Sequence, residues 1–258
     1  MISNSYYNYK NKTKGQNGSV LIIGGCDLYT GAPYTSALSA FLTGTDLVYI
    51  FSGKESILSL KTLLPEAIVS QIKYEEWILR KINVCILGPG LGVVENTTTD
   101  TINKILRYLG SRSIPLIVDA DGIRNIDRFD VETYKNIIYT PNKNEAKFVK
   151  LNNDNQFSLY KGIKDIIVSG DITIEIEDRP CSKRCGGQGD ILNGILASLL
   201  IKLKDGLSRE GIIRSMCISS RILRKAGYLA YENKGVSTMS RDILEKIPDV
   251  INNEKESF

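Results

Sequence analysis

Histidine is absent from the 258-residue chain. Its absence excludes Ser-His-Asp and Cys-His nucleophilic catalysis, and it excludes metal sites built on imidazole. Carboxylates, lysines, thiols and backbone amides remain, together with any bound Mg²⁺. That inventory favours kinases and related enzymes over hydrolases that depend on an imidazole base.

Long apolar runs are also missing. No stretch of about 18 apolar residues is present, so we expect no membrane span and no membrane partner. Residues 1–17 are rich in Tyr, Asn and Lys, with no apolar core of a secretory signal and no arginine. We therefore expect a cytoplasmic protein, although organelle targeting by the N-terminal tail stays open.

The net charge is small and the cysteines are few. The net charge of +4 is small, and the dense basic cluster is Lys10, Lys12 and Lys14, which we interpret as a solvated tail rather than a nucleic-acid surface. Five cysteines form no metal-binding or disulfide spacing, which predicts free thiols and no structural metal. For Cys185 we weigh a packing thiol against a redox sensor and favour packing.

Short β-branched apolar runs alternate with helical patterns, as in a parallel sheet whose strands are buried on both faces. The predicted strands are 20–23, 47–51, 84–87, 116–118, 137–139 and 166–168, with an edge or antiparallel strand at 171–177. The predicted helices are 34–43, 54–63, 97–109, 143–150, 156–161, 190–203, 208–232 and 240–247. We expect a tail over 1–14 and one α/β domain over 15–258.

The most informative stretch is 184–194, where glycines precede Asp190 and an apolar helix follows. A side-chain-free backbone at a helix N-terminus can bind an anion, and an adjacent carboxylate can take a proton from an attacking hydroxyl. Phosphoryl transfer is one interpretation. A glycine-rich turn with an Asp N-cap is the other.

Further polar motifs follow the predicted strands, where ligands collect in open parallel sheets. Gly88–Gly92 is either a tight turn or a ligand-facing loop, and Tyr29–Tyr34 is either a helix start or a substrate contact. Asp119 and Asp121 are either caps or contacts to Mg²⁺ or substrate. Asn142 and Glu145 form a capping box or organise hydrated Mg²⁺. Lys161, Gly162 and Asp165 form a charged turn or contact a nucleotide; no Walker A motif is present.

Taken together, these motifs resemble the ATP-dependent NAD(P)H-hydrate dehydratases of the ribokinase-like superfamily from Lys14 to about Ile247. Tyr29-Thr30-Gly31-Ala32-Pro33 and Arg184–Asp190 (RCGGQGD) carry most of the likeness. Thr140-Pro141-Asn142 resembles the eukaryotic, ATP-using branch. The resemblance implies a three-layer ribokinase-like sandwich with a mainly parallel central sheet. It also implies a lyase that repairs hydrated NADH and NADPH (NADHX and NADPHX), releasing ADP and phosphate.

The resemblance assigns site residues as follows. Asp190 is the catalytic base. The substrate would contact Gly90, Gly92, Asn142, Lys143, Asn144, Glu145, Ala146, Lys147, Phe148 and Asp190. ATP would contact Lys161, Gly162, Ile163, Lys164, Asp165, Arg184, Cys185, Gly186, Gly187, Gln188 and Gly189. Mg²⁺ would be held through water by Asn142 and Glu145. A separate epimerase would act alongside this enzyme, and a homo-oligomer is left open.

The chain departs from the family pattern at two places. Phe148 stands where relatives commonly carry arginine, which leaves Lys147 or Lys150 as replacement contacts for the substrate phosphate. Thr45 replaces the usual alanine. Two rival functions remain: a ribokinase-like vitamin or sugar kinase, and a catalytically silent nucleotide-binding protein.

Overall fold

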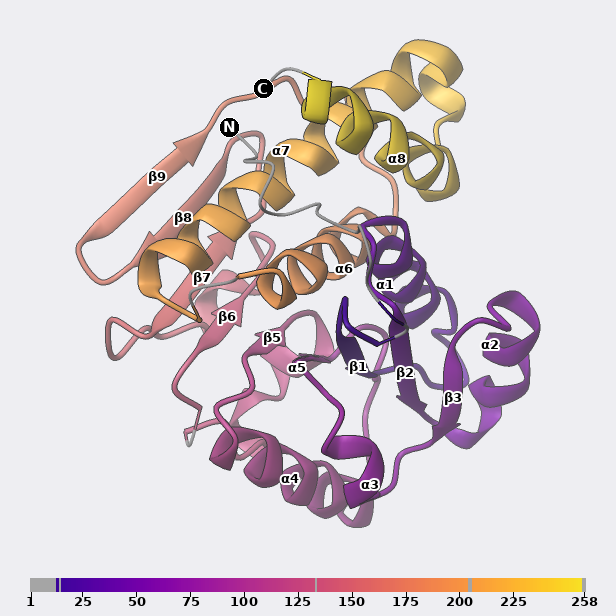
Figure 1. Ribbon diagram of the computed structural model, residues 1–258, viewed down its shortest axis with the longest axis vertical. Coiled ribbons are helices and arrows are strands. Elements are labelled where there is room, and N and C mark those ends of the chain that lie inside the picture. The colour runs from indigo at the N-terminus through magenta and orange to yellow at the C-terminus, as the bar shows by residue number, and fades with distance from the viewer. Residues whose placement is uncertain (1–12, 14, 133, 204–205, 257–258) are drawn as a thin grey trace.

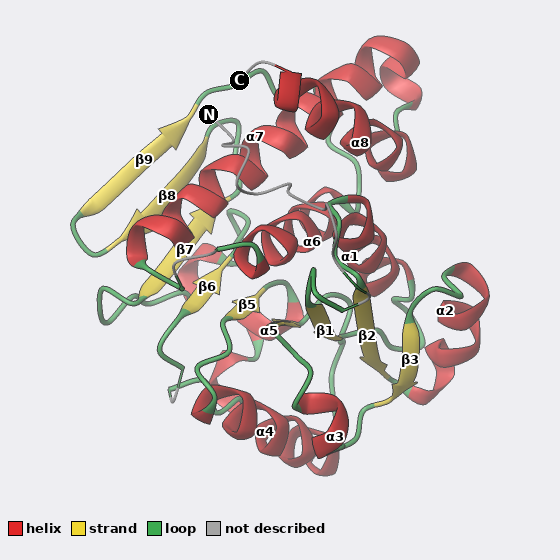
Figure 2. Ribbon diagram, viewed as in Figure 1, coloured by secondary structure: helices red, strands yellow, loops and turns green. Residues whose placement is uncertain are grey.

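A computed structural model describes residues 13, 15–132, 134–203 and 206–256 (Figure 1). The tail predicted for residues 1–14, with its lysine cluster, lies outside the described residues apart from Thr13. Helices cover both faces of one central sheet, which gives three layers (Figure 2). The expected three-layer α/β fold is confirmed.

The sheet has nine strands in the order β3-β2-β1-β4-β5-β6-β7-β8-β9. Pairing is parallel from β3 to β7 and antiparallel from β7 to β9. The strands are β1 (Ser19–Ile23), β2 (Leu47–Ser52), β3 (Ile68–Gln71), β4 (Val84–Leu87), β5 (Leu116–Val118), β6 (Ile137–Tyr139), β7 (Gln156–Tyr160), β8 (Asp165–Ser169) and β9 (Ile172–Ile176).

One face of the sheet packs against α1 (Gly31–Leu42), α2 (Ile57–Leu63), α6 (Gln188–Ile201) and α7 (Arg209–Lys234). The other face packs against α3 (Glu76–Leu79), α4 (Asn96–Ser111) and α5 (Asp121–Arg124). An outer helix, α8 (Ser240–Glu256), covers α6 and α7. Short 3₁₀ turns occupy Lys54–Ser56, Ile126–Arg128, Ala146–Phe148 and Gly235–Ser237.

Strand β1 shows why the central runs are continuously apolar. Val20 and Ile22 enter the core on the α6 side, whereas Leu21 and Ile23 enter the core on the α4 side, and all four are fully buried. Successive side chains of a strand point to opposite faces, so a strand covered on both sides needs apolar residues at every position.

The segment 156–161, predicted as a helix, is strand β7 instead. Phe157 and Leu159 are both fully buried on the α6 side of the sheet. Their spacing of two residues is the period of a strand, and the sequence interpretation missed it. The expected antiparallel edge strand is confirmed as β9, but β8 is antiparallel too, with alternating rather than continuous burial.

The helix predicted over 143–150 is also wrong, because only the 3₁₀ turn Ala146–Phe148 forms there. Strand β3 and the short helix α3 were not predicted. All five cysteines are free thiols, as expected. None of the helices in the described part of the chain is long and apolar enough to cross a membrane.

Candidate active site at the strand ends

The N-terminus of α6 carries the glycine motif to the rim where the parallel strands end. Gly187 precedes the helix with a φ of 93°, and a Cβ there would lie 2.9 Å from the Cβ of Ser240. Only glycine adopts this backbone without strain and fits this contact. The first backbone N–H groups of the helix have no partner within it, which makes this end suitable for an anion.

Asp190 lies in the first turn of α6 and is half-buried. Burial raises the pKa of its carboxyl to about 8, and the negative charges of Asp119 and Glu145 add to that increase. The Lys161 ammonium and backbone hydrogen bonding act in the opposite direction. A carboxyl with a pKa in this range is a far stronger base than an ordinary aspartate, which suits proton abstraction from a hydroxyl.

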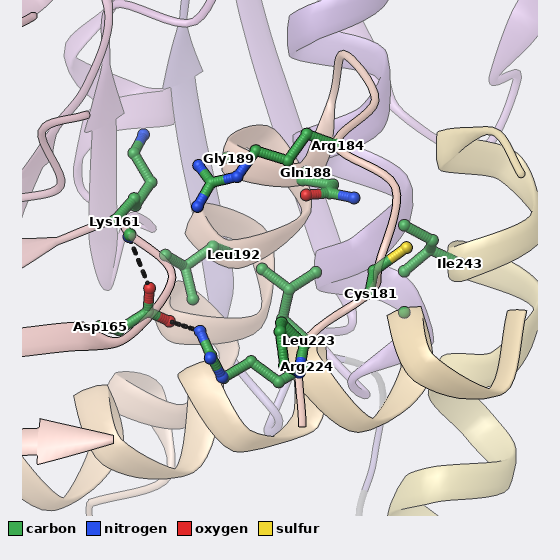
Figure 3. Close-up of a pocket in the computed structure, with 13 residues that line it drawn as sticks. Lys161, Asp165, Cys181, Arg184, Gln188, Gly189, Leu192, Leu223, Arg224 and Ile243 are labelled. Atoms are coloured by element: carbon green, nitrogen blue, oxygen red, sulfur yellow. Dashed lines mark hydrogen bonds and ion pairs between the residues drawn. The ribbon is translucent and has the colours of Figure 1, made fainter. Parts of the chain in front are cut away.

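A pocket opens beside this helix end (Figure 3). Part of the predicted ATP-binding set lines it: Lys161, Gly162, Asp165, Arg184, Gln188 and Gly189. Apolar walls come from Leu192, Leu223 and Ile243, while the Cys181 thiol lies at one side. Cations next to an apolar wall fit a nucleotide, whose phosphates and base require different surroundings.

Ile163 and Lys164, two residues of the predicted ATP-binding set, do not line this pocket. The Ile163 residue is 81% exposed. The Lys164 ammonium pairs with Glu177 and with Glu175, 3.3 Å away, both on the β9 side. Cys185 packs against the core formed by α6, α7 and α8, and burial raises the pKa of its thiol. That contact supports the packing interpretation of Cys185.

The Asp165 carboxylate is occupied by the protein itself. It accepts hydrogen bonds from the Gly162 N–H (3.0 Å) and the Ser220 hydroxyl (2.6 Å). Its Oδ2 also lies 3.3 Å from Nη1 of Arg224, a buried arginine on α7 that the sequence analysis did not single out. Asp165 therefore shapes the 161–165 loop rather than offering a free carboxylate to a ligand.

Arg224 also donates hydrogen bonds to two backbone carbonyls, one in the loop before β8 and one in the loop after β9. Its Nε donates to the Asp178 carbonyl (2.8 Å) and its Nη2 donates to the Ile163 carbonyl. The helical spacing of Ser220, Arg224 and Gly227, all on the pocket side of α7, is the signal that could have identified it.

The turn after β4 brings three strand-end loops together. Gly90 and Gly92 have φ values of +61° and +67°. A Cβ on Gly90 would lie 2.8 Å from the Cβ of Tyr29, and one on Gly92 would lie 3.0 Å from Sγ of Cys26. The Gly92 N–H donates to Oδ2 of Asp121 (2.8 Å). Both glycines thus accommodate the neighbouring loop of the protein, which supports the tight-turn alternative; their contact with substrate stays a prediction.

This geometry yields an expected result for Gly90→Val. Positive φ and the contact with Tyr29 together should lower the free energy of unfolding by about 1–3 kcal/mol. Gly235→Val is the matched control, because Gly235 also has a positive φ (+53°) but open space around its Cβ position. Thermal melting should show a larger loss for Gly90→Val. A normal melting temperature combined with a selective defect toward one substrate would contradict this account.

The residues after β6 form a reciprocal capping box on a single turn. The Asn142 Oδ1 accepts from the N–H groups of Asn144 (2.9 Å) and Glu145 (3.1 Å), and Oε2 of Glu145 accepts from the Asn142 N–H (3.0 Å). Glu145 is only 2% exposed. Its Oε1 lies 3.0 Å from Nη2 of Arg124 on α5. The turn is held by these bonds without a regular helix, which is why the helix prediction failed.

Arg124 was also missed by the sequence analysis. Its guanidinium links Glu145 to Asp121, whose Oδ1 lies 2.9 Å from Nη1. A cation therefore does lie near this turn, although Phe148 stands at the position where arginine is common. Lys147 and Phe148 instead form a cation–π pair (5.0 Å) and line a separate hollow with Phe129 and Tyr139. Lys143 and Asn144 are exposed beside the turn.

The carboxylates near Asp190 are poorly placed to bind Mg²⁺ directly. Within the described residues, no cluster of three or more acidic or thiol side chains is arranged to hold a metal ion. The carboxylates of Asp119, Asp121 and Glu145 are each bonded to protein groups. Mg²⁺ commonly keeps several waters and binds mainly through substrate phosphates, so a water-mediated role for Asn142 and Glu145 fits better than direct coordination.

The chain is similar to known proteins over most of its length. A family model for NAD(P)H-hydrate dehydratase matches residues 20–249. An ATP-dependent (S)-NAD(P)H-hydrate dehydratase of Entamoeba histolytica is 32% identical, covering 92% of this chain and 87% of the relative.

Two crystal structures share the fold at low identity. A ribokinase-like superfamily protein of Enterococcus faecalis has a TM-score of 0.78 at 20% identity, covering 95% of this chain and 90% of the other. The ADP/ATP-dependent NAD(P)H-hydrate dehydratase of Bacillus subtilis, co-crystallised with ATP and Mg²⁺, has a TM-score of 0.75 at 18% identity, covering 95% and 92%. The ribokinase-like architecture is thereby confirmed.

Proposed function

The chain belongs to the NAD(P)H-hydrate dehydratase family, and we propose that it is a lyase that dehydrates the S-epimer of hydrated NADH and NADPH at the expense of ATP. The observation that carries this proposal is the Asp190 carboxyl, whose pKa is raised to about 8, at the N-terminus of α6 beside a pocket lined by cationic and apolar side chains. A base and an anion-binding helix end meet there, as transfer of a phosphoryl group to a hydroxyl requires.

In the proposed reaction, Asp190 accepts the proton of the hydroxyl on C6 of the nicotinamide ring. The hydroxyl oxygen then bonds to the γ-phosphorus of ATP while the bond from that phosphorus to the bridging oxygen breaks, releasing ADP. The C6–O bond breaks next, with help from the lone pair of the ring nitrogen, and phosphate departs. Loss of a ring proton restores NADH or NADPH. Phosphorylation is needed because hydroxide is a poor leaving group.

The backbone N–H groups of residues 186–189 would stabilise charge on the transferring phosphoryl group, in the manner of an oxyanion hole. Arg184 extends over the pocket toward the first turn of α6 and supplies a further positive charge (Figure 3). Lys161 lies on the opposite side, with its Nζ 2.7 Å from Oδ1 of Asp119. Two cations and a helix N-terminus therefore surround the position where the ATP phosphates would bind.

We propose that Mg²⁺ binds together with ATP, where it would neutralise the charge of the phosphates. Removing Mg²⁺ with a chelator should stop turnover. If Glu145 organises the hydration shell, Glu145→Gln should raise the Mg²⁺ concentration needed for half-maximal rate by about tenfold. Arg124→Met is the matched control, since it breaks the same ion pair but keeps the carboxylate. An equal Mg²⁺ requirement in Glu145→Gln and the wild type would leave Asn142 and Glu145 with the role of stabilising the turn alone.

The test of the function is incubation of the protein with hydrated NADH, ATP and Mg²⁺. Recovery of the near-ultraviolet absorbance of NADH, with one ADP and one phosphate released per NADH formed, supports the proposal. A stable phosphorylated product would indicate a small-molecule kinase instead. Nucleotide binding by calorimetry without turnover of any hydrate would indicate a silent binding protein. Cooperation with a separate epimerase, a cytoplasmic location and the oligomeric state stay predictions.

A further inference from the structure

Three neighbouring strands are each followed directly by a polar residue: β5 by Asp119, β6 by Thr140 and β7 by Lys161. Because these strands are parallel, the three residues lie along the same rim of the sheet. Asn193 on α6, one helical turn after Asp190, approaches this row from the helix. Asp119, Thr140 and Asn193 are almost completely buried.

The four side chains form one chain of hydrogen bonds. The Thr140 hydroxyl donates to Oδ1 of Asn193 (3.0 Å), and Nδ2 of Asn193 donates to Oδ2 of Asp119 (2.6 Å). Oδ1 of Asp119 accepts from the Lys161 ammonium (2.7 Å). The orientation of the amide is settled by its neighbours, because an ionised carboxylate only accepts hydrogen bonds. Thr140 must therefore donate to the amide oxygen.

This chain ends against the catalytic turn. A Cβ on Gly189 would lie 2.9 Å from Nζ of Lys161 and 3.5 Å from Oδ2 of Asp119, so both charged groups contact the residue that precedes Asp190. An ammonium so close to Asp190 has two possible carboxylate partners. If it paired with Asp190, it would stabilise the ionised form and make that carboxylate a weaker base. Asp119 competes for the same ammonium and keeps it at the rim.

We propose that Asn193 is a positioning residue for phosphoryl transfer: through Asp119, its amide holds the Lys161 ammonium at the anion-binding helix end and away from the Asp190 carboxylate. The inference rests on the proposed function, because it assigns Lys161 to the transferring phosphoryl group. Without the amide, Asp119 keeps one of its two restraints and can rotate. The Lys161 ammonium, which stays paired with Asp119, then moves with it away from the N-terminus of α6.

The test is a double-mutant cycle on the rate of NADH recovery at saturating ATP. Asn193→Leu removes both hydrogen bonds at similar side-chain volume and should lower kcat by about 10²-fold, the cost of misplacing a catalytic group by about 1 Å. Lys161→Met should lower kcat as well. Because Asn193 acts through Lys161, the double variant should be no slower than Lys161→Met alone. The KM for hydrated NADH should stay near the wild-type value in Asn193→Leu.

Ser198→Ala is the matched control on the same helix. It removes a buried hydrogen bond to the Thr43 carbonyl (3.1 Å), far from Asp119, so it should lower the melting temperature and leave kcat unchanged. If Asn193→Leu does not fold, Thr140→Val breaks the same chain at its other end, and Thr140→Ser should rescue kcat because it keeps the hydroxyl.

Additive losses in the cycle, or a wild-type kcat in a folded Asn193→Leu or Thr140→Val protein, would overturn the positioning role. Those outcomes differ from failure of the proposed function, in which the wild-type protein itself recovers no NADH.

Discussion

Asp190→Asn is expected to lower kcat for hydrated NADH by about 10²–10⁴-fold, the usual contribution of a positioned general base. The amide keeps the shape of the side chain but cannot accept a proton to form the neutral acid. ATP binding should persist, since Lys161, Arg184 and the helix end remain in place. Single-turnover measurement of NADH recovery, together with calorimetric titration of ATP, separates the chemical step from binding.

Asp171→Asn is a suitable control for this substitution. Asp171 lies in the turn between β8 and β9, away from the strand-end rim, with its side chain 88% exposed and paired to Arg209. The Asp171→Asn variant should turn over hydrated NADH at the wild-type rate. Near-normal turnover in Asp190→Asn would remove Asp190 from the role of base, whatever the behaviour of the control.

The pH dependence of the reaction should carry the signature of the raised pKa of Asp190. The base must be ionised to act, so kcat/KM for hydrated NADH in the free enzyme should rise with pH through a midpoint near 8. At pH 6, two units below that midpoint, the rate should be roughly 100-fold under its plateau. An ascending limb near pH 4, the usual range of aspartate, would contradict the environment described for this carboxyl.

The free energy of unfolding should fall as the pH rises, whereas the rate should increase. The pKa of Asp190 is raised in the folded state above its ordinary value of 3.8. Its contribution to the free energy of unfolding is therefore fully present below about pH 4 and is lost as the pH rises toward 8. Asp190→Asn removes this ionisation, so the variant should melt at a higher temperature than the wild type at pH 8 and above. A lower melting temperature for the variant there would count against a raised pKa of the Asp190 carboxyl in the folded state.

Much of the fold is determined by local sequence patterns. Runs such as 20–23 and 84–87 are apolar at every position because they are buried on both faces, and a continuous run is visible without any tertiary information. The glycine motif at 186–189 could also be identified from the sequence, since the left-handed Gly187 and the helix that follows are local features. The central parallel strands, the long helices and the catalytic candidate Asp190 could therefore be identified from the sequence.

Other segments were decided by their surroundings. Strand β7 (Gln156–Tyr160) is short and partly polar, and it becomes a strand because Phe157 and Leu159 find a buried face between β6 and β8. The turn after β6 stays irregular because Glu145 is held by Asn142 and by Arg124, which is 21 positions away. The spacing of Asn142 and Glu145 is a local pattern, but no local pattern contains the Arg124 partner.

The same distinction separates the residues of the site. The sequence by itself determined that glycines, Asp190 and lysines suited to phosphoryl transfer are present, because their types and local spacing carry that chemistry. Only the tertiary structure decided that Asp165 is enclosed by Arg224, that Gly90 packs on Tyr29, and that Asn193 joins Thr140 to Asp119. These contacts join residues that are distant in the sequence and meet only where separate strands end at one rim. One of them, Asp119, is also among the charges that raise the pKa of Asp190.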